Sequence, residues 1–339
     1  MSTQETSTHH MIHNMMRIPD LSDEQFVGAV CGLRPCRRGG LRIETERLGS
    51  KTIVHHYGHG GCGVTLSFGS AQLAADLVDG IAKPNQTIGV LGAGIVGLTT
   101  ARELLNRGYR VRLYADKVST QTTSAIAAAL WLPVGIDHGD TPGQVALMND
   151  ALVRSKRVFD GLDPETYGIQ DLDMYEPMSS STDEFVFQKG TIEPPRAIEA
   201  FPFATNAVPG RVFTSKFIHN NQFLRVIHDE VLALGGEIVE RKIESSNELG
   251  ELDETVLVNC LALGSKQVFG DDRVYPARGV IVHMKAQDLG YGVHDGYRYM
   301  FPRKDALILG GCFQEERWDE VPDQAMIDEI LDHHRRFFA

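Results

Sequence analysis

The chain has 339 residues, and at roughly 150 residues per domain this length predicts two domains or one large α/β unit with an ample core. Hydrophobic residues make up 42% and charged residues 23% of the sequence, a globular balance that excludes a fully disordered or coiled-coil chain. The formal net charge is −12 without a long block of lysine and arginine, which disfavours nucleic acid and anionic membranes as partners.

The cysteines and the first residues of the chain indicate the cellular compartment of the protein. The five cysteines are odd in number and lack CxxC spacing, so free thiols in a reducing environment are expected. The first residues lack a basic start followed by an apolar segment, and no apolar run approaches the roughly 18 residues of a membrane span. We expect a cytoplasmic protein that does not insert into membranes.

Residues 1 to about 20 are polar and without apolar periodicity, which predicts a mobile tail. Strands are expected over 26–35, 41–46 and 52–58 because these segments alternate or are rich in β-branched residues. The turn GHGGCG at 58–63 then leads into a segment with helical periodicity up to about residue 82. The pattern is strand, glycine turn and helix.

A short linker, residues 83–86, precedes a second strand, glycine turn, helix and strand over 87–116. Gly92, Gly94 and Gly97 form G-x-G-x-x-G between an apolar strand and a helix start, and Asp116 follows Gly97 by 19 residues. In a dinucleotide-binding fold such glycines let the backbone approach a pyrophosphate, and such an acid binds the ribose hydroxyls. The motif predicts FAD or NAD rather than NADP.

The second half alternates without a clean linker. It is irregular to about residue 213, apart from an amphipathic stretch near 144–162. A helix is expected over 220–236 and a last helix over 322–339. Strands are expected over 237–243, 255–260, 278–284, 297–302 and 305–311.

Several motifs together resemble the D-amino-acid oxidase family: VLGAGIVGL, VRLYADK, TTSAIAAALWLP, LVNCLALG, PARGVIV, YMFPRKDALILGGCFQ, GLRP and YGHGGCGVTLSFGSA. In that family the nucleotide-binding strand opens the chain, whereas GLRP and YGHGG close it. Here both closing motifs precede Gly92, so the sequence resembles a circular permutant.

The resemblance implies an α/β fold in which an FAD-binding, Rossmann-like parallel sheet domain is interleaved with an α+β substrate domain of mixed or antiparallel sheet. Residues 27–133 and 213–276 are expected to form the FAD-binding domain, and 134–212 and 277–339 the substrate domain. Residues 1–26 would be the tail and the start of the substrate domain. The oligomeric state is left open, with a homodimer as one expectation.

The implied activity is oxidation of the C–N bond of an amino acid, with a D-amino acid as the expected substrate. A hydride passes to FAD, the imine hydrolyses to a 2-oxo acid and ammonia, and O2 is reduced to H2O2. By resemblance Arg34 clamps the substrate carboxylate, Tyr299 bonds the same group, and Gly61 lies at the flavin ring. No protein nucleophile is needed, and no metal is expected.

The resemblance also implies a set of cofactor-binding residues. They are Gly60, Gly61, Cys62, Gly63, Val64, Thr65, Gly92, Ala93, Gly94, Ile95, Val96, Gly97, Asp116, Lys117, Thr123, Ser124, Leu130 and Ile243.

Other interpretations of these residues stay open. On the residues alone Arg34 fits a solvated basic edge, Tyr299 a half-buried strand tyrosine, and the histidines at 55, 56 and 59 with Cys62 a zinc-like cluster. Arg298 and Arg303 could contact an acidic substrate group or lie on the surface.

The sequence departs from the family pattern at Cys62, Ala129, Leu132, Leu261 and Asp295 or Tyr297. These departures allow one alternative, an oxidase of a modified amine or secondary amino acid in a biosynthetic pathway. A second alternative, from another class of function, is a catalytically silent flavin-binding protein.

Overall fold

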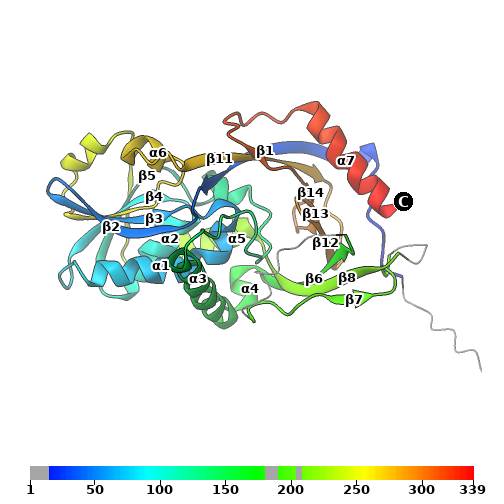
Figure 1. Ribbon diagram of the computed structural model, residues 1–339, viewed down its shortest axis with the longest axis horizontal. Helices are drawn as coiled ribbons and strands as arrows, with labels where there is room; N and C mark the ends of the chain where they lie inside the picture. Colours follow the sequence, from blue (N-terminus) through cyan, green and yellow to red (C-terminus); the bar gives the residue numbers. More distant parts are fainter. Residues whose placement is uncertain (1–14, 180–189, 204–207) are drawn as a thin grey trace, which may run out of the picture.

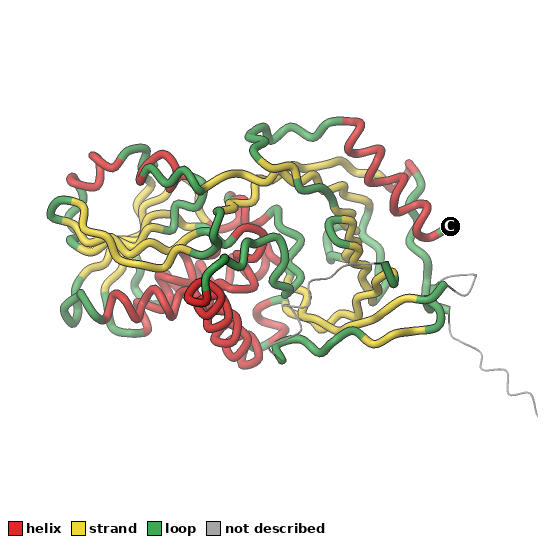
Figure 2. Tube along the Cα trace, viewed as in Figure 1, coloured by secondary structure: helices red, strands yellow, loops and turns green. Residues whose placement is uncertain are grey.

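The computed structural model describes residues 15–179, 190–203 and 208–339. Two sheets, one on each side of the molecule along its long axis, organise these residues (Figure 1). The helices of the first side gather around the smaller sheet, whereas the second side is mostly strand (Figure 2).

The smaller sheet has six strands in the order β2-β3-β10-β4-β5-β9. All neighbours run parallel except the edge pair β2 and β3, which is antiparallel. Its central strands β4 and β10 read as apolar runs, as in Ile88, Val90 and Leu91, because helices and loops cover both faces. The bounds are β2 Arg42–Leu48, β3 Lys51–Tyr57, β4 Thr87–Ala93, β5 Arg110–Val118, β9 Glu237–Glu240 and β10 Val256–Asn259.

Helices α1 and α2 lie on one face of this sheet, next to α3 and α5 (Figure 1). Phe68 of α1 packs against Phe159 of α3 with ring centroids 5.3 Å apart, and Phe223 of α5 stacks on Phe159 at 5.6 Å. The opposite face is covered by α6 and the loop around Leu249. The bounds are α1 Gly63–Asp79, α2 Ile95–Asn106, α3 Pro142–Gly161, α4 Pro164–Tyr167, α5 Asn220–Ala233 and α6 Gly264–Phe269.

The larger sheet has nine strands in the order β1-β11-β14-β13-β12-β6-β8-β7, with β15 paired to β11. Only β12 and β6 are parallel neighbours. Helix α7, Gln324–Phe338, covers its outer face through Ile327, Ile330 and Leu331 (Figure 1). The bounds are β1 Phe26–Arg37, β6 Ile169–Pro177, β7 Arg196–Ile198, β8 Gly210–Ile218, β11 Val274–Met284, β12 Tyr291–Asp295, β13 Arg298–Pro302, β14 Leu307–Gly310 and β15 Gln314–Glu315.

Two long strands connect the sides. Strands β1 and β11 pair antiparallel from Phe26 opposite Met284 to Arg37 opposite Val274, and they run from the larger sheet toward the smaller one (Figure 1). The chain forms β1, β2, β3 and α1 before it reaches β4. Both sheets therefore contain strands that precede the G-x-G-x-x-G turn. Residue Arg34 is thereby carried to the boundary between the sheets.

The expected α/β class and most expected elements are present. Helix α3 coincides with the amphipathic stretch near 144–162, whereas α4, β6, β7 and the start of β8 lie where the sequence predicts irregular structure. Residues 1–14 of the predicted tail lie outside the described residues. Over residues 15–20 the structure differs from a mobile tail, because Pro19 is buried and the N–H of Met16 donates to the carbonyl of Pro202 at 2.9 Å.

Candidate active site

A cavity of about 460 Å³ lies between the two sheets. It is lined by the carboxyl ends of β3, β4 and β5, by the first turns of α1 and α2, and by residues of β1, β11 and β13. In an open parallel sheet this edge is where ligands bind. All predicted site residues line this one cavity except Cys62.

The turn from β4 into α2 depends on glycines. Gly92 has φ +102°, and a Cβ there would lie 2.7 Å from the carbonyl oxygen of Cys260. A Cβ on Gly97 would overlap the carbonyl oxygen of Gly92, so the helix approaches the strand as closely as backbone allows. These close approaches bring the first turn of α2 to the cavity wall.

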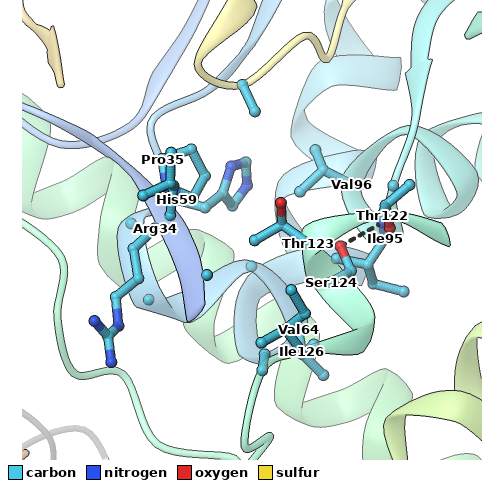
Figure 3. Close-up of a pocket in the computed structure, with 18 of the residues that line it drawn as sticks. Arg34, Pro35, His59, Val64, Ile95, Val96, Thr122, Thr123, Ser124 and Ile126 are labelled. Atoms are coloured by element: carbon cyan, nitrogen blue, oxygen red, sulfur yellow. Dashed lines mark hydrogen bonds between the residues drawn. The ribbon is translucent and has the colours of Figure 1, made fainter. Parts of the chain in front are cut away.

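The start of α2 is suited to an anion. Gly94 begins the helix without a side-chain cap, and no acidic residue lies in the first turn. The N–H of Ile95 donates to Ser124 Oγ at 3.1 Å, which places the predicted Thr123–Ser124 segment against this turn (Figure 3). The positive end of the helix dipole therefore faces the cavity.

The carboxyl end of β5 carries the acid that the sequence predicts to bind the ribose. Asp116 and Lys117 are exposed at the end of this strand and line the cavity with Arg241, Lys242 and Ile243. Ile243 is buried against the same apolar cluster as Tyr114 and Leu257. Leu130 lines the cavity as well, where it bridges to Phe217 of β8.

The turn into α1 is the second glycine turn at the cavity. Gly60 has φ +52°, and the N–H of Gly61 donates to the carbonyl of Gly135 at 2.8 Å. A Cβ on Gly61 would lie 3.0 Å from the carbonyl oxygen of Val134 and 3.6 Å from Cδ of Arg34. Gly61 thus lies beside Arg34, the predicted carboxylate clamp.

Cys62 differs from its neighbours in this turn. Its side chain is fully buried away from the cavity, and Sγ donates to the carbonyl of Val134 at 2.8 Å. Burial raises the pKa of this thiol well above its ordinary value, so the side chain stays neutral. Sequence reasoning could not separate Cys62 from Gly61 and Gly63, because a 3-10 turn sends successive side chains in different directions.

Arg34 and Tyr299 meet at the substrate end of the cavity. The guanidinium of Arg34 lies at the end away from Thr122–Ser124 (Figure 3), and its Nη1 donates to the carbonyl of Cys312 at 3.0 Å. The rings of Tyr297 and Phe313 lie 5.8 and 5.5 Å from it. Burial raises the pKa of Tyr299, while the positive charge of Arg34 acts in the opposite direction. The phenol and the guanidinium are therefore close enough to share one ligand group.

The three histidines of the zinc-like alternative each have another partner. His55 contacts Glu46 at 2.9 Å, His56 contacts Thr100 at 2.9 Å, and His59 contacts Ser70 at 2.9 Å. Burial lowers the pKa of His59 to about 3, so this cavity residue is neutral. Across the described ranges, no three His, Cys, Asp or Glu side chains gather into a metal-binding group.

The remaining arginines of the sequence analysis lie elsewhere. Arg298 pairs with Glu329 and Arg303 with Asp305, and neither lines the cavity. Sequence reasoning missed His294, which lines the substrate end and is held by buried Glu176 at 3.1 Å. It also missed Gly279, Ile281 and Phe301. The period-2 pattern of β11 and β13 marks their shared face, but not that this face meets a ligand.

The residues present fit an FAD molecule. Two helices of 17 and 12 residues begin at glycines on the same cavity wall, and neither has an acidic residue in its first turn. One can hold the pyrophosphate, and the other can face the negative charge of reduced flavin. Asp116 lines the same cavity, and its carboxylate would be an acceptor for the ribose hydroxyls.

Comparison with known proteins agrees with this geometry. The family model described as FAD dependent oxidoreductase, DAO, matches residues 87–339. A D-amino-acid oxidase of Streptomyces coelicolor is 29% identical over 254 residues, which are 71% of this chain and 74% of that protein. One of Rubrobacter xylanophilus is 30% identical over 249 residues, with the same coverage.

The fold has solved counterparts. The crystal structure of glycine oxidase from Geobacillus kaustophilus superposes with a TM-score of 0.56 at 16% identity, covering 74% of this chain and 77% of that chain.

The family match begins at residue 87, so Arg34, Gly60, Gly61 and Gly63 lie outside the matched stretch although they line the same cavity. Among the helices of the described residues, none combines the length and hydropathy that a bilayer crossing needs. The chain is an enzyme that belongs to the FAD-dependent oxidoreductases of the D-amino-acid oxidase type, and its cofactor is FAD.

Proposed function

We propose that the enzyme oxidises D-amino acids to the corresponding imines, which water hydrolyses to 2-oxo acids and ammonia. The observation that carries this proposal is the convergence of Arg34 and Tyr299 beside the glycine turn at Gly61. A planar guanidinium binds a carboxylate through two parallel hydrogen bonds, and a phenol can add a third. Relatives named D-amino-acid oxidase support the substrate class.

The residues of the chain bind and orient the substrate. Arg34 and Tyr299 hold the carboxylate, which fixes the α-carbon relative to the cofactor. Tyr297 and Phe313 stack with centroids 4.7 Å apart and lie 5.8 and 5.5 Å from the Arg34 guanidinium, so their rings limit water around Arg34 and the substrate carboxylate. When bound, FAD would supply the hydride acceptor, with O2 as the final oxidant and H2O2 as its product.

The substrate is tested by anaerobic mixing of the holoenzyme with a panel of D- and L-amino acids. D-amino acids should bleach the flavin absorbance, and their L-enantiomers should not. If no amino acid bleaches the flavin, the chain fits instead a silent flavin-binding protein. An L-selective response would overturn the chirality of the proposal.

The carboxylate clamp is tested with Arg34→Ala. Truncating one partner of a buried charge pair costs about 2–5 kcal/mol of binding, so substrate KM should rise by roughly 30-fold or more. The matched control is Arg38→Ala, because Arg38 is exposed and directly follows the same strand. Unchanged KM in Arg34→Ala would point to an amine substrate without a carboxylate.

We also propose that the chain is a circular permutant of the family arrangement, with an FAD-binding domain over 27–133 and 213–276 and a substrate domain over 134–212 and 277–339. The family match from residue 87 onward supports this order. The placement of β1, β3 and α1 at the cavity also supports it, because these elements precede the matched stretch.

A further inference from the structure

Two glycines lie on the face of the larger sheet that carries Arg34 and Tyr299. Strands β13 and β14 run antiparallel with Met300 opposite Leu309, so Tyr299 is the neighbour of Gly310 across the ladder. Strands β1 and β11 pair Gly32 with Gly279, which places Gly279 diagonally beside Arg34. Both glycines therefore lie under the two predicted carboxylate ligands.

Gly310 lies directly beneath the ring of Tyr299. A Cβ on Gly310 would overlap the ring carbons Cζ, Cε1 and Cε2 of Tyr299. On its other side this ring stacks on Phe301, with centroids 4.8 Å apart and planes at 18°. The phenol thus lies across the bare backbone of the next strand, and its hydroxyl points toward β11 and β1.

Gly279 lies beneath the guanidinium of Arg34 in the same way. A Cβ there would lie 2.5 Å from Nη1 and 2.8 Å from Nη2 of Arg34, closer than real Cβ contacts allow. The hydrogen bond to the carbonyl of Cys312 fixes the Nη1 edge, and the rings of Tyr297 and Phe313 lie nearby. The guanidinium is held between the sheet and this aromatic pair.

We propose that Gly279 and Gly310 are positioning residues for the substrate carboxylate. Because the two glycines have no side chains, Arg34 and Tyr299 lie flat on the sheet. The guanidinium and the phenol hydroxyl are then at the same height above the sheet in the cavity. The inference rests on the proposed function, since it assigns to Arg34 and Tyr299 the carboxylate that the oxidation requires.

The two positions differ in what a methyl group would displace. At Gly279 it would move the end of a flexible arginine side chain, which costs the fold little. At Gly310 it would move a buried aromatic ring that already contacts Phe301. Gly279→Ala is therefore the sharper probe, because its effect falls on the position of a charged group rather than on packing.

The experiment compares Gly279→Ala with Gly28→Ala in the holoenzyme. Gly28 lies on the same strand pair, and a Cβ there would meet no atom within 4 Å. The probe ligand is benzoate, a carboxylate without an amine to oxidise, followed by the change in the flavin absorbance spectrum. Steady-state kinetics use the D-amino acid that bleaches the flavin fastest. Flavin content and urea unfolding report on the fold.

In Gly279→Ala, the benzoate Kd and the substrate KM should rise by roughly tenfold or more, while kcat falls less than KM rises. Flavin content and unfolding midpoint should match those of Gly28→Ala. Unchanged benzoate binding in Gly279→Ala would overturn the proposal. So would loss of flavin together with the weaker binding, because the glycine would then serve the fold and not Arg34.

A double-mutant cycle with Arg34→Ala separates this inference from the proposed function. If Gly279 acts through Arg34, adding Gly279→Ala to Arg34→Ala should weaken benzoate binding no further. Additive losses would overturn the positioning role. If Arg34→Ala alone leaves benzoate and substrate binding unchanged, the proposed function fails first, and any effect of Gly279→Ala then has another cause.

Discussion

A buried carboxylate ties the two sheets together close to the cavity. Asp271 precedes β11 and accepts hydrogen bonds from Arg37 Nε of β1 at 2.7 Å and from the hydroxyl of Tyr57 of β3 at 2.8 Å. All three side chains are buried. The contact fixes the end of the strand that carries Arg34, so at the scale of single residues the position of the site depends on this ionic contact.

Asp271→Asn should lower the free energy of unfolding by about 3–5 kcal/mol, because it leaves the buried guanidinium of Arg37 without its counter-charge. The matched control is Asp272→Asn, whose carboxylate is 98% exposed and which should change stability by about 0.5 kcal/mol or less. Urea denaturation at pH 7 measures both. Equal losses in the two variants would contradict a role for the buried pair.

The pH dependence of this contact has a definite sign. Burial alone opposes the charged form of Asp271, but the hydrogen bonds from Arg37 and Tyr57 outweigh it and hold the pKa below the ordinary value of 3.8. A lowered folded-state pKa gives a contribution that is complete above about pH 4 and is lost as the pH falls through that lowered pKa. The stability difference between the native chain and Asp271→Asn should therefore shrink below about pH 4.

At the scale of elements, the first turn of α1 is fixed by the neighbouring helix. Gly69 of α1 lies against α3 so closely that a Cβ would approach Ser155 N to 2.6 Å and overlap the carbonyl oxygen of Ala151. The hydroxyl of Ser155 also donates to the carbonyl of Thr65 at 2.5 Å. Helix α3 thus holds in place the helix whose N-terminus faces the cavity.

Gly69→Ala should lower the free energy of unfolding by about 2–4 kcal/mol, because backbone rather than a flexible side chain must move. Gly80→Ala is the matched control at the end of the same helix, where a Cβ would come no closer than 3.5 Å to another atom. It should leave stability within about 0.5 kcal/mol of the native chain. Urea unfolding followed by circular dichroism measures both variants. A larger loss in Gly69→Ala than in Gly80→Ala attributes the effect to the packing of α1 on α3, whereas equal changes attribute it to helix propensity.

The elements around the cofactor could be predicted from sequence because each has a local signal. The segment TIGVLGAGIVG predicts a strand, a turn and a helix within a few residues, and Asp116 follows Gly97 at the spacing typical of a dinucleotide-binding fold. Strands β6, β8 and β12 had no such signal, since β6 and β8 mix apolar with polar and charged residues without strict alternation, and β12 has only five residues, YGVHD. The roles of Gly279 and Gly310 depend on cross-strand neighbours, which a single sequence does not specify.

At the scale of the whole molecule, the two described ends of the chain lie side by side. The segment before β1 runs along α7, where Arg335 donates to the carbonyl of Leu21 and pairs with Asp23 at 2.6 Å (Figure 1). The N–H of Met16 bonds to Pro202, against the same cluster as Phe337 and Phe338. Adjacent ends at the surface are the geometry that a circular permutation requires.

The chain order itself can therefore be tested by reversing it. A variant that begins at Asn85, continues through Ala339, passes through a flexible linker of about 10 Gly and Ser residues to Met16, and ends at Pro84 restores the order of the family motifs. Residues 83–85 are exposed, so opening the chain there breaks no buried contact. We expect this variant to fold, bind FAD and retain the substrate KM within about threefold, because the cavity contacts are unchanged.

The control uses the same linker but opens the chain between Ala101 and Arg102, inside α2, where Ala101 is buried. It should lose FAD, since the helix that faces the pyrophosphate site would be cut. Flavin absorbance of the purified proteins and substrate kinetics compare the two variants. Loss of FAD in the Asn85 variant would show that the present connection through Lys83–Gln86 is required for the site, and it would contradict the proposed permutation. Retention of FAD and activity would show that the site depends on which elements meet at the cavity and not on the order in which the chain reaches them.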